Sequence, residues 1–371
     1  MLIMEGKMKK KCIIHLPFYI NMTHPSGSQI RPIKMIRAFE EIGYDVCVIS
    51  GYGKERKEKI IEIKKSIKNG EKYEFVYSES STEPTLLTEK HHMPIYPRMD
   101  FEFLRFCKYR NLKIGLFYRD IYWKFPIYKE SVGFLKRNFA KVFYKYDLSK
   151  YNEILDVLYL PSMEMKKYIY EIKNLKVKEL PPAIEEKRLN TKTKNDNEIL
   201  TIFYVGGITG LYDLEKLFDS VCQCKNIKLI VCCRENEWIN SKDKYEKYLN
   251  GNIEVIHKSG DELKEFYERS DIASLFFEPS EYRSFAMPLK LFEYMQYHKP
   301  MIATKGTATG NFVEKYDIGW NINYNVNSLV EVLNNLNENK LELSNKIENI
   351  TNILDNNTWK ARAEQVAEEL K

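Results

Sequence analysis

The sequence predicts a two-domain α/β protein built around two parallel sheets. Short apolar segments alternate with amphipathic segments along most of the chain, which is typical of strand–helix units. The alternation stops once, at Pro181-Pro182 and the polar stretch 185–198, and restarts at the apolar segment 200–207. A chain of 371 residues is also long for one core and suits two domains.

The first half is expected to form one doubly wound sheet. Short apolar runs predict strands at 12–18, 45–50, 73–77, 113–118, 154–160 and 175–180. Longer amphipathic or charged segments predict helices at 29–43, 54–69, 131–146 and 162–171. Lysines precede the first apolar run as they do in a signal peptide. Because that run is short and contains His15, we interpret it as a buried strand.

The second half repeats the pattern after the polar stretch. Apolar runs predict strands at 200–207, 227–233, 253–256, 272–277, 300–304 and 319–322. Amphipathic segments predict helices at 211–223, 261–269 and 288–298, and throughout 325–371. We therefore expect a second doubly wound sheet followed by C-terminal helices.

These elements define the expected domains. Residues 1–182 form an N-terminal Rossmann-like domain that takes the acceptor, 183–199 form the linker, and 200–355 form a C-terminal Rossmann-like domain that takes the donor. The last helix, 356–371, can pack back on the N-terminal domain. Two such sheets facing each other place a cleft between their carboxyl ends, where doubly wound domains bind ligands in the loops after strands.

Cysteine and charge usage narrow the class of protein. The seven cysteines lie mostly in apolar segments, which suits core residues in a reducing, cytoplasmic compartment. Residues 1–182 carry a net charge of +12 and residues 183–371 a net charge of −6. The basic half is compatible with nucleic acid, an anionic membrane or an anionic substrate, but its dispersed cations form no nucleic-acid motif. No apolar run approaches the length that spans a bilayer.

The segment 276–305 carries the most chemistry. An apolar strand ends in a polar loop, and Pro288 then opens a helix at a position where proline suits the first turn. Lys290 and Glu293 are spaced i and i+3, so they share a face of that helix. Backbone N–H groups near 284–286 would favour a diphosphate, with Lys290 adding charge and Glu293 accepting ribose hydroxyls. The alternative is an ordinary helix whose Lys290 and Glu293 form a solvated pair.

The stretch 288–304, PLKLFEYMQYHKPMIAT, resembles the donor-binding signature of retaining GT-B glycosyltransferases of family 4, also called glycosyl transferases group 1. The resemblance covers about 200–325 well and the first 50 residues more loosely. It implies the GT-B fold and the transfer of a sugar from a nucleotide donor, with retention at the anomeric carbon and without a metal. The absence of any Asp-x-Asp pair agrees with a reaction that needs no metal.

The resemblance also implies roles for individual residues. Catalysis would involve Asp120, Lys290 and Glu293, with Glu293 binding the donor ribose. The donor-binding set is expected to be Gly27, Gly206, Gly207, Arg234, Arg283, Ser284, Phe285, Ala286, Lys290 and Glu293. Phe285 departs from the family pattern, because many members have a glutamate there. The loop after Gly207 lacks the usual basic pair, and Lys290 or Arg283 would compensate.

Two first-domain segments complete the expected site. Gly27 lies between Ser26 and Ser28 before a helix that carries Arg31, and we expect this loop to approach phosphate or sugar. The apolar run 113–118 delivers Arg119 and Asp120 to its carboxyl end. There Asp120 could orient an acceptor hydroxyl, or it could pair with Arg119 and cap the next helix. The expected acceptor and cleft residues are Ser26, Ser28, Arg31, Arg119 and Asp120.

The expected reaction moves a hexose-type sugar, from a UDP-linked donor in the first instance, to a glycan, glycoprotein or lipid-linked acceptor in polysaccharide biosynthesis. No cofactor, metal or nucleic-acid partner is expected, and the oligomeric state is open. The alternatives are a GT-B sugar-nucleotide epimerase and an inactive sugar-binding or scaffolding partner. The basic amphipathic segment 131–150 would lie on an anionic membrane, peripheral at the inner face of the plasma membrane, or against the core with solvated lysines.

Overall fold

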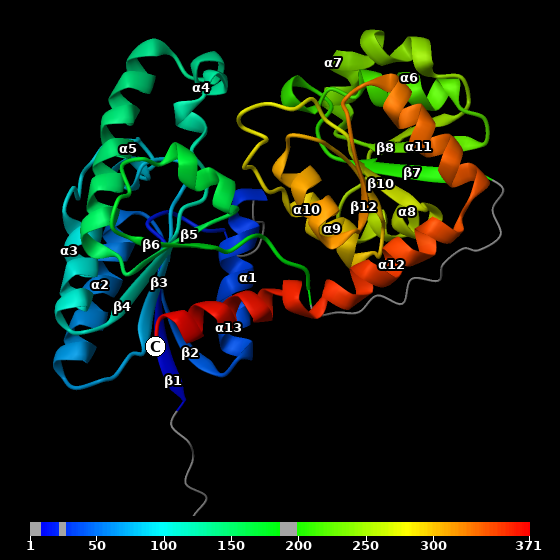
Figure 1. Ribbon diagram of the computed structural model, residues 1–371. Coiled ribbons are helices and arrows are strands. Elements are labelled where there is room, and N and C mark those ends of the chain that lie inside the picture. The colour runs from blue at the N-terminus through cyan, green and yellow to red at the C-terminus, as the bar shows by residue number, and fades with distance from the viewer. Residues whose placement is uncertain (1–8, 22–26, 186–198) are drawn as a thin grey trace, which may run out of the picture. The chain divides into compact units, whose positions relative to one another are not determined.

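The computed structural model describes residues 9–21, 27–185 and 199–371 (Figure 1). The chain divides into two compact units, one formed by Met1–Pro181 with Trp359–Lys371 and the other by Pro182–Thr358. Most of the expected linker, 183–199, lies outside the described residues. The described end of that segment belongs to the second unit, where Ile184 is buried and pairs with Thr358.

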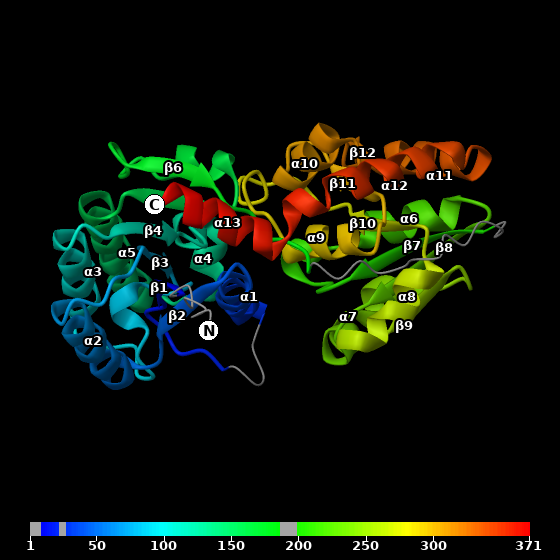
Figure 2. The same ribbon diagram turned by 90° about the horizontal axis from the view of Figure 1, so that it is seen from below.

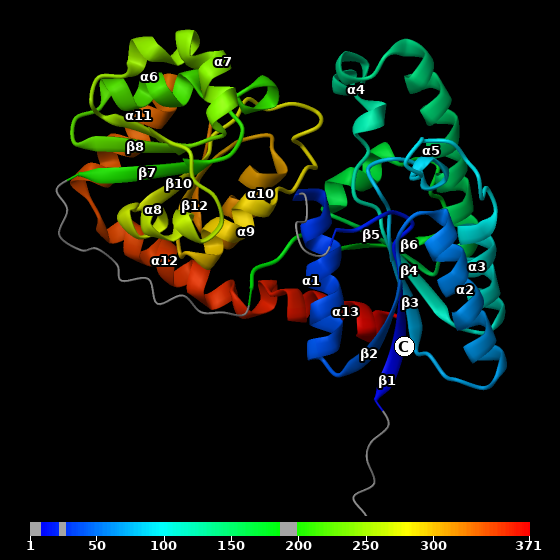
Figure 3. The same cartoon turned by 180° about the vertical axis from the view of Figure 1, so that it is seen from behind.

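The first unit contains a six-stranded parallel sheet in the order β2-β1-β3-β4-β5-β6. Its strands are β1 (Lys10–His15), β2 (Tyr44–Ile49), β3 (Phe75–Glu79), β4 (Lys113–Phe117), β5 (Val157–Leu160) and β6 (Lys176–Glu179). Its helices are α1 (Gly27–Glu41), α2 (Gly53–Lys68), α3 (Met99–Tyr109), α4 (Pro126–Ser131), α5 (Phe134–Ile154) and α13 (Trp359–Glu369). Helices α2, α3 and α5 cover one face of the sheet, and α1 and α13 cover the other (Figures 1 and 3).

The C-terminal helix α13 is an integral part of the first unit. It lies beside α1, as Figure 2 shows, and its apolar side is buried at Ala363, Val366 and Ala367. Glu369 forms an ion pair of 2.6 Å with Lys178 on the last strand. Since α13 supplies part of the helix layer over the sheet, the first unit is formed by two separate segments of the chain, one before and one after the second unit.

The second unit contains a six-stranded parallel sheet in the order β12-β11-β10-β7-β8-β9. Its strands are β7 (Leu200–Val205), β8 (Ile227–Cys232), β9 (Ile253–Ile256), β10 (Ile272–Leu275), β11 (Met301–Thr304) and β12 (Gly319–Ile322). Its helices are α6 (Glu215–Gln223), α7 (Glu235–Tyr245), α8 (Leu263–Arg269), α9 (Leu289–Gln296), α10 (Ala308–Tyr316), α11 (Val326–Glu338) and α12 (Leu341–Ile353). Helices α6 and α11 pack together on one face, and α8, α9 and α12 cover the other (Figures 1 and 3).

Two parallel sheets with helices on both faces confirm the predicted α/β fold class. Strand β7, LTIFYV, is buried over its first five residues because it lies at the centre of a sheet covered on both sides. The sequence patterns missed α3, α4, α7 and α10. The segment predicted as a helix at 162–171 forms only the 3-10 turn Met163–Tyr168. The expected cleft between the two sheets stays a prediction.

Candidate functional site

The carboxyl edge of the second sheet brings together a glycine loop and helix α9. Strand β7 ends at Val205 and is followed directly by Gly206 and Gly207. Gly206 has a φ of +149°, and the space that a Cβ would need there is taken by the ammonium group of Lys290. Glycine is therefore required at 206 both for the backbone conformation and for the close approach of Lys290.

A small pocket of about 50 Å³ opens at this edge. Its walls include Tyr212, Phe277, Arg283, Ala286, Pro288 and Lys290. Leu275, which also lines it, is the last residue of β10, so the pocket lies where the strands end. This is the position at which doubly wound sheets bind ligands. The sequence predicted a ligand site in these loops, but it did not predict that aromatic side chains line the pocket.

Arg283 is a partly buried cation on an aromatic wall of this pocket. Its guanidinium carbon lies 4.3 Å from the ring centroid of Phe277 and 5.3 Å from that of Tyr212. One terminal nitrogen donates to the carbonyl of Leu211, whereas the buried Nε has no hydrogen-bond partner among the described residues. Burial lowers the pKa of Arg283 from its usual value. An unsatisfied donor on a desolvated cation is the feature of a site that accepts an anion.

Lys290, on the first turn of α9, is the second partly buried cation. Its Nζ donates to the Tyr204 hydroxyl at 3.4 Å and lies 4.8 Å from the ring centroids of Tyr204 and Tyr212. Burial lowers the pKa of Lys290 to about 8. No ion pair to Lys290 or Arg283 is found in the part of the chain that the structure describes. Two cations without a carboxylate partner leave this pocket positively charged.

Glu293 lies one turn after Lys290 and is partly buried. Burial raises the pKa of its carboxyl group, and the Tyr267 hydroxyl and Lys290 oppose that rise. The carboxylate is therefore held in a partly desolvated environment at the edge where the glycine loop and α9 meet. It is chemically suited to accept hydrogen bonds from a ligand's hydroxyl groups. The sequence predicted this shared helix face for Lys290 and Glu293, and the structure has both residues on α9.

The turn before α9 corrects one expectation. The N–H groups of Ser284 and Ala286 donate to the carbonyls of Ser280 and Tyr282, so they are used within the turn and cannot all face an anion. Phe285 is buried with its ring edge-to-face on Tyr282, at a centroid distance of 5.3 Å. The sequence misplaced the free N–H groups because the polar loop folds on itself. Those groups belong to the first turn of α9, which begins at Leu289.

Arg234, which was predicted to bind the donor, follows β8, and His257 and Lys258 follow β9. Arg234 is highly exposed and pairs with Glu237 at 3.1 Å. The His257 Nδ1 lies 2.9 Å from the carbonyl oxygen of Cys233, and Lys258 pairs with Glu262. Glu237 was not predicted, yet its carboxylate accepts the N–H of Ile208 at 3.2 Å and so holds the glycine loop. Glu237 could not be predicted from the sequence because it lies on α7, a helix without a strong apolar pattern.

In the first unit, Arg119 and Asp120 follow β4. Arg119 pairs with buried Glu79 at 3.4 Å. The Asp120 Oδ1 accepts the N–H of Tyr122 at 2.8 Å, which caps the 3-10 turn Tyr122–Lys124. The predicted alternative to an acceptor role was an Arg119–Asp120 pair, whereas the structure pairs Arg119 with Glu79 and gives Asp120 a contact to the following turn. The acceptor role of Asp120 stays a prediction. Both side chains remain at the carboxyl edge of the sheet.

Arg31 is placed inside the first unit rather than at an exposed edge. Only 5% of it is exposed, its Nε lies 3.4 Å from Glu79, and its guanidinium stacks 3.5 Å from the Phe117 ring centroid. It also donates to the carbonyl of Pro181 at 3.2 Å. An apolar ring and a buried carboxylate lie against this guanidinium, whereas its Nε and one terminal nitrogen have no hydrogen-bond partner among the described residues. The expectation of a ligand contact stays a prediction.

The β1–α1 loop is only partly described. Ser26 lies outside the described residues, and Gly27 and Ser28 are the first two residues of α1. The structure therefore brings Gly206, Arg283, Lys290 and Glu293 together at one edge. It does not show the predicted first-domain loop residues at a site.

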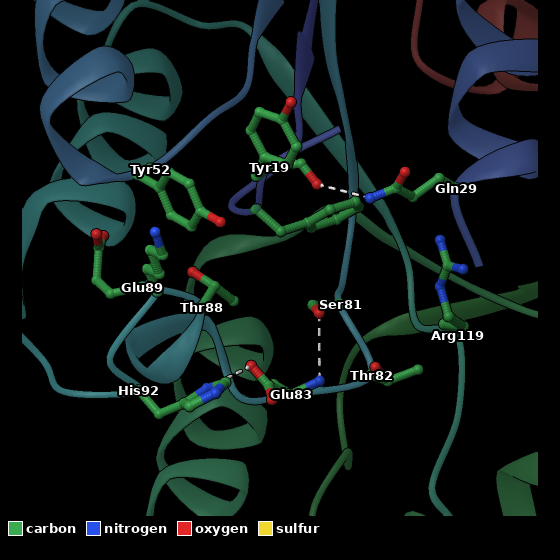
Figure 4. A pocket seen from close by; sticks show the side chains of 12 residues that line it. Tyr19, Gln29, Tyr52, Ser81, Thr82, Glu83, Thr88, Glu89, His92 and Arg119 are labelled. Carbon is green, nitrogen blue, oxygen red and sulfur yellow. Dashed lines mark hydrogen bonds and ion pairs between the residues drawn. The ribbon is translucent and has the colours of Figure 1, made fainter. Parts of the chain in front are cut away.

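A larger pocket of about 350 Å³ lies at the carboxyl edge of the first sheet (Figure 4). Its lining comes mainly from the segments after β1, β2, β3 and β4, and Arg119 is the predicted residue among them. Tyr19 and Tyr52 form one side of it, and the loop 81–92 forms another. None of these other residues was predicted from the sequence, because they come from four separate segments.

The described residues contain neither a membrane-spanning helix nor a cluster of metal ligands. No helix there is long and apolar enough to cross a membrane. Likewise, no group of three or more His, Cys, Asp or Glu side chains in the described ranges could hold a metal ion.

Residues 185–352 match the family described as Glycosyl transferases group 1. The solved glycosyltransferase from Rickettsia africae ESF-5 is similar at a TM-score of 0.65 and 13% identity, over 97% of this chain and 98% of that chain. Sucrose-phosphate synthase from Thermosynechococcus elongatus is similar at a TM-score of 0.64 and 12% identity, over 97% and 98%. MurG from Acinetobacter baumannii is similar at a TM-score of 0.54 and 10% identity, over 97% of this chain and 99% of that chain. No curated protein sequence matches this chain. At these identities, the likeness to solved structures concerns the fold.

Proposed function

We infer that this chain is a glycosyltransferase with the GT-B fold, whose second unit carries the glycosyl transferases group 1 domain. We propose that it moves a hexose-type sugar from a UDP-linked donor to a glycan, glycoprotein or lipid-linked acceptor. Transfer proceeds with retention and without metal or further cofactor. The resemblance of 288–304 to retaining family 4 supports these finer statements.

The observation that carries the proposal is the pair of desolvated cations in one pocket. Arg283 has an unsatisfied Nε, Lys290 has a pKa lowered to about 8, and neither has a carboxylate partner among the described residues. Keeping two such cations partly out of water is unfavourable unless an anion joins them. A nucleoside diphosphate supplies that anion, and its ribose hydroxyls can reach a carboxylate such as Glu293.

The same groups account for the chemistry of transfer. The bond between the anomeric carbon and the diphosphate oxygen breaks, and the acceptor oxygen forms a bond to that carbon on the same face. The acceptor's proton passes to the leaving diphosphate oxygen. Negative charge grows on the diphosphate during this step, so Lys290, Arg283 and the first turn of α9 stabilise the transition state more than the ground state. Asp120 would orient the acceptor.

A membrane-bound location is also proposed for the acceptor step. On α5, Phe134 and Leu135 are 67% and 82% exposed, and Phe139 and Val142 lie on the same helix with 45% and 64% exposed. Lys129, Lys136, Arg137, Lys141 and Lys145 are the nearby cations. A surface with exposed apolar side chains among cations suits an anionic bilayer. The enzyme would then act in the cytoplasm, peripheral at the inner face of the plasma membrane.

The test is a thermal-shift screen with UDP-, GDP-, ADP- and dTDP-sugars on the wild type and Glu293→Ala. A ligand that binds only the folded state raises the melting temperature by mass action. We expect one nucleotide class to stabilise the wild type and not Glu293→Ala. A screen in which no nucleotide stabilises the wild type would overturn the donor site and favour the scaffolding alternative.

Turnover separates the remaining alternatives. Transfer to an added acceptor supports the proposed reaction. Epimerisation of the donor sugar without any acceptor would instead identify a GT-B epimerase, and donor binding without chemistry would identify an inactive sugar-binding partner.

A further inference from the structure

A further groove of the first unit lies in its helix layer. It has a volume of about 400 Å³ and opens between α2 and the segment 95–102, which leads into α3. Figures 1 and 3 show α2 and α3 as neighbours in the layer that covers one face of the sheet. None of the residues that line this α2–α3 groove belongs to the donor or acceptor set of the proposed reaction. The groove therefore needs a function of its own.

One wall of the α2–α3 groove is a single stripe of α2. That helix contributes Lys57, Ile60, Ile61 and Lys64 to the lining. Positions i, i+3, i+4 and i+7 share one face of a helix, and this stripe extends about 10 Å along the helix axis. Ile60 is buried in the unit, whereas Ile61 remains 58% exposed. The stripe has the spacing with which one helix receives the side chains of another.

The opposite wall is apolar and held in place. It includes Ile95, Tyr96 and Met99, and Ile95 is 55% exposed. The ring of Tyr96 takes the space that a Cβ on Gly53 would need, so glycine at the start of α2 lets the ring lie directly against the helix. Because this wall is already ordered, a ligand binds it at a lower cost in conformational entropy.

Three cations border these apolar walls. The Nζ of Lys57 lies 5.5 Å from the ring centroid of Tyr96, and that of Lys64 lies 5.3 Å from the ring centroid of Phe106. Arg98 lines the groove as well. No ion pair to Lys57, Lys64 or Arg98 is found among the residues that the structure describes. Their charges are therefore available to a partner.

The excess of positive charge indicates the chemistry of that partner. Glu102 is the carboxylate of the lining, and it stands against the three cations. Lys59, on the same helix but outside the lining, is by contrast paired with Glu62 at 2.8 Å. Charge complementarity thus favours an acidic partner. Apolar walls with charged groups around them resemble the apolar core and polar rim of a protein interface.

We propose that the α2–α3 groove binds an acidic amphipathic helix of a partner protein. The apolar side chains of that helix lie against Ile60, Ile61 and Met99, and its carboxylates pair with Lys57 and Lys64 at the two ends of the stripe. This is the mode in which a groove recognises a helix by anchors at i, i+3, i+4 and i+7. The site is separate from the donor groups of the second unit, so the proposal does not depend on the reaction.

The test is fluorescence anisotropy of labelled synthetic helices titrated with the full chain. The acidic probe has leucines on one face and glutamates beside them. One matched probe has lysines in place of the glutamates, and another has serines in place of the leucines. We expect only the acidic leucine probe to bind, and we expect its affinity to fall as the salt concentration rises.

Two groove variants and two control variants locate the binding. The double change Lys57→Glu with Lys64→Glu reverses the charge, and Ile61→Ser removes an exposed apolar contact. Each is expected to weaken binding of the acidic probe about tenfold or more. Lys65→Glu, at an exposed lysine of α2 outside the lining, and Tyr109→Ser, at an 84% exposed tyrosine of α3, should bind as the wild type does. Thermal unfolding checks that every variant is folded.

The proposal is overturned if the acidic probe does not bind, if the lysine probe binds equally well, or if both groove variants bind as the wild type does. Two other occupants would also overturn it. Groove-dependent binding to phosphatidylglycerol vesicles without peptide binding would identify a membrane surface. A dimer in analytical ultracentrifugation that Ile61→Ser abolishes would identify a second copy of this chain.

Discussion

The ammonium group of Lys290 fills the space that a Cβ on Gly206 would need. Lys290 lies in the first turn of α9 and Gly206 directly follows β7, so this contact joins two segments far apart in the chain. The missing side chain lets the cation lie directly against the strand end, within reach of the Tyr204 hydroxyl. The contact fixes the position of a charge at the edge where a diphosphate is proposed to bind.

Gly206→Ala is expected to abolish UDP-induced stabilisation, because the new Cβ displaces the Lys290 ammonium. The positive φ adds a strain of about 1–3 kcal/mol. Thermal unfolding with and without UDP measures both effects. Gly43→Ala is the control, since Gly43 has a φ of +95° but open space around its Cα. A Gly206→Ala variant with the full UDP-induced shift would contradict the relationship.

Lys290→Met is expected to lower turnover by on the order of 10²-fold, because the leaving diphosphate loses a cation. The same variant should be at least as stable as the wild type at pH 7, since it removes a buried charge. Lys299→Met is a matched control. Its ammonium is also buried, with a pKa lowered to about 8, but it donates to the Ser270 carbonyl away from the pocket. Unchanged turnover in Lys290→Met would refute the role.

The lowered pKa of Lys290 also predicts that folding stability and affinity for UDP change in opposite directions as the pH rises. Between about pH 8 and 10.5 the unfolded chain binds more protons at this residue, so its contribution to folding stability rises with pH. Over the same window the folded ammonium loses its proton, so affinity for UDP should fall. Calorimetric titration of UDP from pH 6.5 to 9.5 measures this fall. It should be absent in Lys290→Met, whose residual affinity should not change around pH 8.

Asp147→Asn is expected to remove a pH dependence of stability in the first unit. Asp147 is buried on α5 and accepts the Thr85 N–H at 2.7 Å, and burial raises its pKa to about 7. Between the ordinary value of 3.8 and about 7 the folded state binds more protons, so this contribution falls as pH rises. Urea unfolding measures the free energy of unfolding of both proteins at pH 5 and pH 8. The difference between the variant and the wild type should shift by about 1–3 kcal/mol in favour of the variant at pH 8. An equal difference at both values would contradict this account.

Replacement of Phe134, Leu135, Phe139 and Val142 by serine is expected to prevent sedimentation with phosphatidylglycerol vesicles. All four side chains are exposed, so the fold should survive the change. The wild type should bind phosphatidylglycerol vesicles but not phosphatidylcholine vesicles. Its binding should be lost at high salt, because the cations supply part of the attraction. Ile239→Ser, at an apolar residue 66% exposed on the second unit, is the control. A wild type that binds neither vesicle would remove the membrane proposal.

Much of the fold could be predicted because strands between two helix layers must be apolar along their length. This is true of β7 and β10, which the sequence marks clearly. Helices α7 and α10 were missed because their segments are polar or contain glycine, and their packing decides their conformation more than local preference does. The loop 280–286 was misread for a similar reason, since its turn depends on hydrogen bonds within the loop.

The sequence by itself determined the two α/β units, the glycine loop after β7 and the helix that carries Lys290 and Glu293, because these follow from local patterns of residue type and spacing. Only the tertiary structure decided that Arg283 and Lys290 share an aromatic pocket, that Arg31 is buried, and that Tyr19 and Tyr52 stack at the other sheet. Each of these outcomes depends on contacts between segments distant in the chain. Such contacts are set by packing and desolvation, which no local pattern records.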